Sequence, residues 1–312
     1  MPIDGVLLAA GRGERLRPLT DVLAKPAIPL LDIPLGAWGL TAVREAARSV
    51  VVNVSDLGER IVGALAPYGD FEVLDEGAEP FGTAGTLLAL RDRLAPTFVT
   101  MSADVLTNLA PAILLEAHRR RGAAMTVAMR SVERGADLRT EAGAVTGFVD
   151  RRVEADAPGG LFLNLAAIEL SALEVLPDRR PLGLGESLLK PLAERGDVAV
   201  HPSDDYWLDV GTIERYLQAG ADLLEGRGPP PPRPHPGEFV DLPHGRAYVG
   251  SEVGIDEDSL GPGAVVLEGA QVQMGAYVER AVVWPDEVVP AGTRLRECVW
   301  AAGAAHRPAA SE

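Results

Sequence analysis

The sequence predicts an α/β sheet domain followed by a β-helix, and three observations support this prediction. Short apolar runs alternate with helix-period segments between residues 3 and 102, which is typical of parallel strands covered on both faces. A proline-rich stretch at 226–236 marks an abrupt change of composition. Beyond this stretch an aliphatic residue returns at every sixth position, which is the period of a β-helix.

The elements of the first domain follow from the spacing of their apolar residues. In chain order we expect a strand at 3–10, a helix at 37–49, a strand at 50–54, a helix at 56–68, a strand at 71–74, a helix after Thr83 and a strand at 97–102. The first strand leads directly into a glycine-rich turn. Together these elements predict a sheet domain over residues 1–225.

The stretch Gly226–Pro236 favours a semi-rigid polyproline II conformation, so we expect a linker at 226–244. A PxxP ligand for another protein is the alternative interpretation of these prolines. The second domain is expected over residues 245–302. Its aliphatic repeat positions are Leu260, Val266, Val272 and Val278. An antiparallel hairpin region is the alternative, but it would not explain the Gly-Ala dipeptide that recurs with the same period. Residues 303–312 are expected to be disordered.

Composition and charge limit the classes of function. The chain has 312 residues and one cysteine, Cys298, which excludes an internal disulfide and is typical of a reducing cytoplasm. Its apolar runs are shorter than the roughly 20 residues that cross a bilayer, and its start lacks the pattern of a signal peptide. We therefore expect a cytoplasmic protein without a membrane partner. The net charge of −16 argues against a nucleic-acid partner, so a polyphosphate ligand would need a local basic cluster.

A glycine-rich loop after the first strand provides such a cluster. Its small residues let backbone N–H groups approach phosphate oxygens, and its arginines add charge-assisted hydrogen bonds. The loop lacks the Gly-Lys-Ser/Thr of a Walker A motif. Prolines at 18, 26 and 29 interrupt the long helix that would follow a Rossmann turn. The loop residues expected to bind a nucleotide are Leu8, Ala9, Ala10, Gly11, Arg12 and Gly13.

The loop, continued by Lys25-Pro26-x-x-Pro29, resembles the signature of the sugar-1-phosphate nucleotidyltransferases, also called NDP-sugar pyrophosphorylases. The resemblance implies that Gly11, Gly13, Arg15 and Lys25 contact the phosphates of a nucleoside triphosphate, with Arg15 and Lys25 as catalytic residues. Composition supports Lys25 independently, because the chain has only one other lysine, Lys190. Ala24 stands where the family usually has proline, which should affect the stiffness of the loop more than its chemistry.

Two aspartates are expected to bind Mg²⁺. Asp104 follows the strand at 97–102, at the edge of the sheet where α/β proteins bind ligands, and Asp209 lies in Trp-x-Asp-x-Gly-Thr. The resemblance implies that both are metal ligands and catalytic residues, although Ala103 replaces the family's glycine. Capping or turn aspartates are the alternative. The scattered histidines argue against zinc, and a Gly-x-Ser-x-Gly hydrolase elbow is missing.

Three further segments, one for the base and two for the sugar, are candidates for recognition of these groups. The segment Glu76–Gly85 resembles the family's Glu-x-Pro-Leu-Gly-Thr-Ala-Gly, which implies that Glu79, Gly82, Thr83 and Gly85 bind the nucleotide. A carboxylate at Glu79 could accept two N–H bonds from guanine, and a solvated loop residue is the alternative. The sugar-side motifs depart from the family pattern, and their candidate residues are Asp150, Arg151 and Asn164.

The layout most resembles the mannose-1-phosphate guanylyltransferases, which implies a Rossmann-like mixed sheet followed by a short left-handed β-helix. The implied reaction is GTP with mannose 1-phosphate giving GDP-mannose and pyrophosphate, with Mg²⁺ as cofactor. A uridylyl-, thymidylyl- or adenylyltransferase is one alternative. A non-catalytic homologue that binds a nucleotide sugar is the other, because the sugar-side motifs are altered. Flat faces of a β-helix favour pairing, so a homo-oligomer is expected.

Overall fold

The computed structural model describes residues 1–149 and 153–309, and the chain forms two compact units. Unit 1 consists of Met1–Gly11 and Gly39–Trp207, and unit 2 consists of Arg12–Trp38 and Leu208–Glu312. The border between the units therefore falls inside the glycine-rich loop. None of the helices in the described part of the chain combines the length and apolar character that a bilayer crossing needs.

The helices are α1 (Leu19–Val22), α2 (Leu35–Ala46), α3 (Gly58–Leu65), α4 (Thr83–Leu90), α5 (Pro111–Arg121), α6 (Lys190–Glu194) and α7 (Ile213–Leu224). The strands up to residue 209 are β1 (Ile3–Leu8), β2 (Pro29–Leu30), β3 (Ile33–Pro34), β4 (Val50–Val54), β5 (Glu72–Asp75), β6 (Leu94–Ser102), β7 (Val105–Thr107), β8 (Met125–Val132), β9 (Leu138–Glu141), β10 (Ala144–Phe148), β11 (Gly159–Glu169), β12 (Val198–Pro202) and β13 (Trp207–Asp209). The later strands are β14 (Glu238–Leu242), β15 (Gly245–Val249), β16 (Val265–Val266), β17 (Gln271–Val272), β18 (Tyr277–Glu279), β19 (Val282–Val283), β20 (Val288–Val289), β21 (Arg294–Arg296), β22 (Val299–Ala301) and β23 (Ala304–His306).

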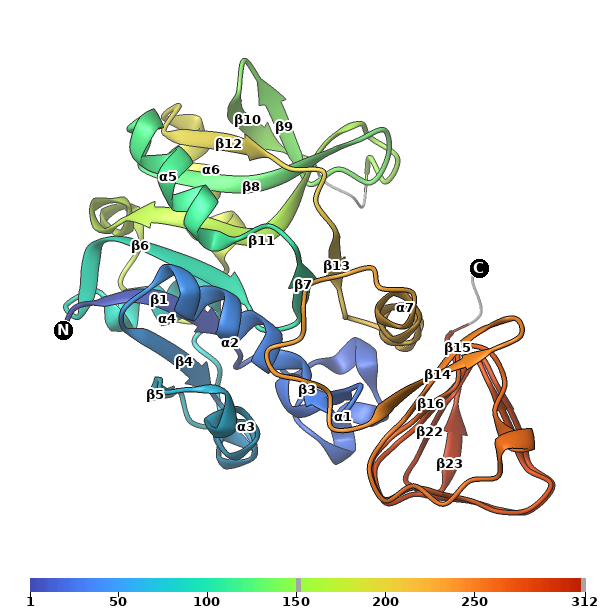
Figure 1. Ribbon diagram of the computed structural model, residues 1–312. Coiled ribbons are helices and arrows are strands. Elements are labelled where there is room, and N and C mark those ends of the chain that lie inside the picture. Colours follow the sequence, from blue (N-terminus) through green and yellow to red (C-terminus); the bar gives the residue numbers. More distant parts are fainter. Residues whose placement is uncertain (150–152, 310–312) are drawn as a thin grey trace. The chain divides into compact units, whose positions relative to one another are not determined.

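Unit 1 is built on a nine-stranded mixed sheet in the order β5-β4-β1-β6-β11-β8-β12-β10-β9 (Figure 1). The four strands expected from the sequence, β1, β4, β5 and β6, lie side by side and run parallel. Strand β11 runs antiparallel to both of its neighbours, β6 and β8. All five residues of β4 are buried, as a strand covered on both faces requires. The prediction of an α/β domain is confirmed.

Unit 2 contains parallel ladders of very short strands, which Figure 1 shows in orange and red. One ladder runs β15-β16-β19-β22, a second joins β17 to β20, and a third joins β18 to β21. Val265 pairs with Val282, and Val282 with Val299, so each partner lies 17 positions further along the chain. Val266, Val272 and Val278 are buried in the core of this region, as their six-residue spacing predicts.

The segment Arg12–Trp38 belongs to unit 2 because its polar groups find partners there. The Tyr216 hydroxyl of α7 donates to the Pro29 carbonyl, and the Tyr248 hydroxyl donates to Asp32 Oδ2 at 3.0 Å. The other oxygen of Asp32 accepts from the Glu268 backbone N–H at 3.0 Å. Burial raises the pKa of this carboxyl above its ordinary value of 3.8. Contacts so distant in sequence cannot be inferred from local composition.

The composition change at 226 lies inside unit 2 and is no border between compact units. The hairpin of β14 and β15 begins within the stretch expected to be linker, so the prolines occupy a shorter connection than predicted. Strand β23 falls within the stretch expected to be disordered. It pairs antiparallel with β22, and these backbone hydrogen bonds explain why residues 304–306 are ordered despite their composition.

Candidate functional site

The start of the glycine-rich loop is held in place by unit 1. The Ala9 N–H donates to Asn53 Oδ1 at 2.7 Å, and the Ser55 hydroxyl donates to the Ala10 carbonyl at 2.8 Å. The Ala103 N–H donates to the Leu8 carbonyl at 2.9 Å, so the ends of β1 and β6 are adjacent. Asp104 lies in the turn that follows β6. This edge of the sheet therefore brings the first loop residues and the first expected metal ligand together.

The second part of the loop is folded on itself in unit 2. Gly13 has a positive φ of 63°, and its carbonyl accepts from the Thr20 hydroxyl at 3.0 Å. A Cβ at this position would lie 2.9 Å from Thr20 Cγ2 and 3.1 Å from Lys25 Cβ. Glycine is required here by the left-handed backbone and by the close approach of Lys25. The loop geometry thus fixes where the Lys25 side chain begins.

Arg15 and Lys25 converge on Asp209 within unit 2. The Lys25 ammonium lies 3.8 Å from Asp209 Oδ1, and the Arg15 guanidinium lies 3.7 Å from Asp209 Oδ2. Lys25 is buried with 8% of its surface exposed, whereas the Arg15 side chain is 71% exposed. A Cβ at Gly211 would lie 2.8 Å from Arg15 Nη2, so glycine leaves room for the guanidinium. The Lys25 ammonium is therefore fixed by burial, whereas the Arg15 guanidinium remains accessible to a ligand.

The expected base segment is packed against the backbone around Leu182. Gly82 has a positive φ of 76°, and a Cβ there would lie 2.5 Å from the Leu182 carbonyl oxygen. The Gly85 N–H donates to that carbonyl at 3.2 Å, and the Thr83 hydroxyl accepts from the Leu184 N–H at 2.7 Å. The requirement for glycine at 82 thus has a cause within the protein itself. Glu79 is exposed on the preceding turn.

Only part of the expected sugar side can be placed. Asp150 and Arg151 lie outside the described residues. Asn164 has a positive φ of 55° and lies at a register shift between β11 and β8. The next residue, Leu165, pairs with Met101 of β6, which places Asn164 near the strand end that leads to Asp104. Leu165 and Ala166 are buried in the sheet, so the two residues that follow Asn164 are core residues.

Each unit carries part of the expected site. In unit 1 lie Leu8, Ala9, Ala10, Gly11, Glu79, Gly82, Thr83, Gly85, Asp104 and Asn164. In unit 2 lie Arg12, Gly13, Arg15, Lys25 and Asp209.

A buried polar cluster beside the loop was not predicted from the sequence. It consists of Asn53, Glu76 and Thr86, which are 3%, 6% and 0% exposed. The sequence does contain an indication of this cluster, because Asn53 is the one polar residue of the Val-Val-Val-Asn-Val strand β4. A polar side chain in a strand buried on both faces needs hydrogen-bond partners, and this requirement predicts further buried polar residues nearby.

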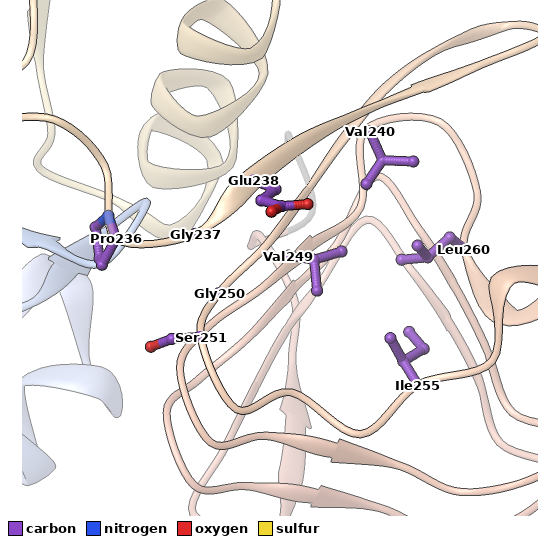
Figure 2. A pocket seen from close by; sticks show the side chains of 9 residues that line it. All are labelled: Pro236, Gly237, Glu238, Val240, Val249, Gly250, Ser251, Ile255 and Leu260. Carbon is purple, nitrogen blue, oxygen red and sulfur yellow. The ribbon is translucent and has the colours of Figure 1, made fainter.

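Two of the cavities in the described part of the chain are lined by other residues. One of about 440 Å³ lies in unit 2, and Figure 2 shows Val240, Val249, Ile255 and Leu260 around it. The other, of about 580 Å³, lies in unit 1 and is lined by Glu169, Leu173 and their neighbours. Neither is lined by a residue of the expected site.

Comparison with known proteins decides the family. The sequence profile described as Nucleotidyl transferase matches residues 4–226. The chain belongs to the nucleotidyl transferase family. Two similar relatives are a mannose-1-phosphate guanylyltransferase of Mycobacterium tuberculosis and a UTP–glucose-1-phosphate uridylyltransferase of Synechocystis. The first is 28% identical over 89% of this chain and 83% of that protein, and the second is 25% identical over 97% and 90%.

A solved structure of the same fold is HddC from Yersinia pseudotuberculosis, complexed with GMP-PN. It superposes with a TM-score of 0.60 at 18% identity and covers 71% of this chain and 99% of that chain. The superposed part of this nucleotidyl transferase therefore has the fold that the sequence motifs suggested.

Proposed function

We propose that this nucleotidyl transferase joins a nucleoside triphosphate to a sugar 1-phosphate and releases pyrophosphate. The observation that carries the proposal is the buried Lys25 ammonium beside Asp209, with the Arg15 guanidinium at the other carboxylate oxygen. A compact ammonium held at a fixed position is suited to neutralising charge at a crowded phosphorus. The names of the relatives support the sugar 1-phosphate as the acceptor.

The reaction forms one bond and breaks another at the α-phosphorus. An oxygen of the sugar 1-phosphate attacks in line, while the bond from the α-phosphorus to the pyrophosphate oxygen breaks. Arg15 and the backbone N–H groups of residues 10–13, which follow the Ala9 N–H bound by Asn53, hold the departing pyrophosphate. Lys25 offsets the negative charge at the α-phosphorus. Catalysis thus depends on positioning and charge neutralisation by this chain.

Asp104 and Asp209 are the residues that would hold Mg²⁺. Within residues 1–149 and 153–309 there is no group of three or more histidine, cysteine, aspartate or glutamate side chains suited to a metal. Mg²⁺ fits such a sparse donor set, because it retains water and takes phosphate oxygens beside one or two carboxylates. When bound, the ion supplies additional neutralisation of the phosphate charge.

The preferred substrates in this proposal are GTP and mannose 1-phosphate. The exposed carboxylate of Glu79 offers two acceptor oxygens, which match the N–H groups on the edge of guanine. The Mycobacterium tuberculosis relative acts on mannose 1-phosphate with a guanylyl group by its name, whereas the Synechocystis relative is a uridylyltransferase. UTP, dTTP and ATP therefore remain alternatives to be tested beside GTP.

We further infer that the parallel ladders of unit 2 form a left-handed β-helix through which the chain assembles into a homo-oligomer. The ladder of β17 and β20 supports this inference, because its neighbourhood exposes the uncharged residues Gln271, Gln273, Met274 and Val288. In a chain with a net charge of −16, a group of exposed uncharged side chains is where a second copy meets least repulsion.

The test is pyrophosphate release by the purified protein with Mg²⁺, crossing four nucleoside triphosphates with a panel of sugar 1-phosphates. We expect release that requires one triphosphate and one sugar phosphate together and that disappears in Asp104→Asn. A protein that binds nucleotide sugar without metal and stays silent across the panel would be a non-catalytic homologue, and the proposal would be wrong.

A further inference from the structure

The buried cluster of Asn53, Glu76 and Thr86 has an almost complete set of hydrogen bonds. The Asn53 amide Nδ2 donates to Glu76 Oε1 at 2.8 Å and to Thr86 Oγ1 at 3.0 Å. The Thr86 hydroxyl donates to the same Glu76 oxygen at 2.5 Å. Burying a carboxylate costs free energy unless it accepts hydrogen bonds. Here the Asn53 amide and the Thr86 hydroxyl supply those hydrogen bonds to Glu76 inside unit 1.

The cluster contacts the backbone at two places that matter for the proposed reaction. On one side Asn53 Oδ1 accepts from the Ala9 N–H at 2.7 Å, at the start of the glycine-rich loop. On the other side Glu76 Oε2 accepts from the Phe81 N–H at 2.7 Å, which closes the turn that carries Glu79. The cluster is therefore a continuous polar link between the loop expected at the phosphates and the segment expected at the base.

We propose that Asn53, Glu76 and Thr86 are positioning residues that set the nucleotide affinity of this site by holding the loop and the base segment in one fixed arrangement. This inference rests on the proposed function, because it assumes that both segments bind the nucleoside triphosphate. Packing alone does not require such a cluster, since apolar residues of the same volume would fill a core at least as well. What polar residues add is one defined arrangement of donors and acceptors.

The donor–acceptor arrangement can be inverted without changing the shape or net charge of the pair. Asn53→Asp turns the donor that faces Glu76 into an acceptor but keeps the acceptor for the Ala9 N–H. Glu76→Gln turns an acceptor oxygen into a donor nitrogen. In the double variant the new amide at 76 donates to the new carboxylate at 53 and still accepts from the Phe81 N–H. The Thr86 hydroxyl then has the Gly82 carbonyl as an acceptor, 3.1 Å away.

The experiment compares four proteins: the wild type, the two single variants and the double variant. For each protein it measures the Kd for GTP and for each other triphosphate. It also measures kcat and the KM of both substrates. We expect each single variant to weaken triphosphate binding and to raise its KM about tenfold, the effect of one unsatisfied buried partner. The KM for the sugar 1-phosphate should stay unchanged. The double variant should return to within about threefold of the wild type.

A pH series adds a readout that a loss of stability would not produce. In Asn53→Asp two carboxylates face each other, and protonation of either one restores a donor, so its KM for the triphosphate should fall as pH is lowered. The wild-type KM should lack this change. Glu59→Gln, the same substitution at an exposed position of α3, is the control and should behave as the wild type.

The outcomes separate the two proposals. Single variants with wild-type KM, or a double variant as impaired as the singles, would overturn the positioning role alone, provided that the wild type releases pyrophosphate. A wild type that binds triphosphate but does not turn over would contradict the proposed function, and the Kd values would still decide the positioning role. A wild type that binds no nucleoside triphosphate would overturn both.

Discussion

Lys25 is a buried cation in a chain with only two lysines. Removal of its ammonium is the change that should lower the reaction rate most. Lys25→Ala should lower kcat by a factor of about 10²–10³, because a preorganised charge at the α-phosphorus is lost. Lys25→Arg should recover little, since a guanidinium fork does not fit a site shaped for a compact ammonium. Steady-state pyrophosphate release measures both variants.

The matched control is Lys190→Ala. Lys190 is half exposed and pairs with Glu186 one helical turn away, 3.6 Å from its carboxylate, so its loss should leave kcat unchanged. Equal effects of the two alanine variants would show that overall charge, rather than the position of Lys25, determines the rate.

At the residue scale the sequence indicated which charged residues of the loop gather, but it did not indicate the buried residues that hold the loop. Arg15, Lys25 and Asp209 were each expected at the site from their motifs, and unit 2 brings both cations within 4 Å of the Asp209 carboxylate. Glu76 was passed over, although it stands in the same segment as Glu79, because a loop glutamate is usually solvated. Only the buried Asn53 of β4 could have indicated that a carboxylate is needed inside the protein.

At the scale of single elements, Gly82 shows how a turn constrains the helix that follows it. Gly82→Ala should destabilise the protein by about 2–4 kcal/mol, because it combines a left-handed backbone with a Cβ 2.5 Å from the Leu182 carbonyl oxygen. Urea denaturation followed by circular dichroism measures the change in midpoint. Since α4 begins at Thr83, part of the expected loss is disorder at its first turn.

Gly63→Ala provides the comparison on another helix. A Cβ at Gly63 of α3 would meet no atom within 4 Å, so alanine should stabilise by about 0.5–1 kcal/mol through its helix propensity. The prediction for Gly82 would be wrong if both alanine variants shifted the midpoint in the same direction.

The elements themselves were predictable where burial produces a simple pattern. Strands β1, β4 and β6 contain apolar runs because most of their residues are buried, whereas β5 lies at the edge of the sheet and is mostly exposed. The antiparallel β11 was not predicted, since its direction depends on pairing with β6 and β8 and not on its composition. In unit 2 the six-residue repeat held from Val266 to Val278 and then shortened, because the next valine of the buried core is Val283, five positions further on.

At the scale of the whole molecule, Asp32 makes the stability of unit 2 depend on pH. Its carboxyl accepts from Tyr248 and from the Glu268 N–H, and burial raises its pKa above 3.8. The folded protein then binds this proton more tightly than the unfolded chain does. Stability from this group is therefore greatest below pH 3.8 and is lost as the pH rises through the raised folded-state pKa.

Asp32→Asn removes this titration and leaves the other groups, including His235 and Glu268, in place. The free energy of unfolding of the wild type minus that of the variant should fall as pH rises from about 3 and then become constant above the folded pKa. Chemical denaturation of both proteins at a series of pH values gives this difference. A difference that is flat or rises with pH would contradict the assignment.

The proposed homo-oligomer belongs to the same scale. Met274 is 82% exposed and Val288 is 47% exposed at the ladder of β17 and β20. Met274→Glu should shift the protein toward monomer, because it places a charge among the exposed uncharged side chains. Light scattering coupled to size exclusion measures the mass. Ile113→Glu, at an apolar position on α5 of unit 1 that is 50% exposed, should leave the mass unchanged.

The division of the chain into units could not have been predicted from composition. The prolines after 226 indicate a change of architecture, but Arg12–Trp38 joins unit 2 through Tyr216, Tyr248 and Asp32, whose partners lie about two hundred positions away. Such pairings depend on topology, and a single sequence does not report them.

The parallel ladders of unit 2 also bear on how this chain can change in length. Each turn of 17 residues contacts mainly the turn before and the turn after it, so a whole turn could be duplicated or deleted between Val266 and Val283 with the remaining register preserved. Turns cannot be added in the same way at the two ends of the array, because the antiparallel strands β14 and β23 occupy the outer edges of the longest ladder. Relatives should therefore differ inside this array by whole turns, with both terminal hairpins retained.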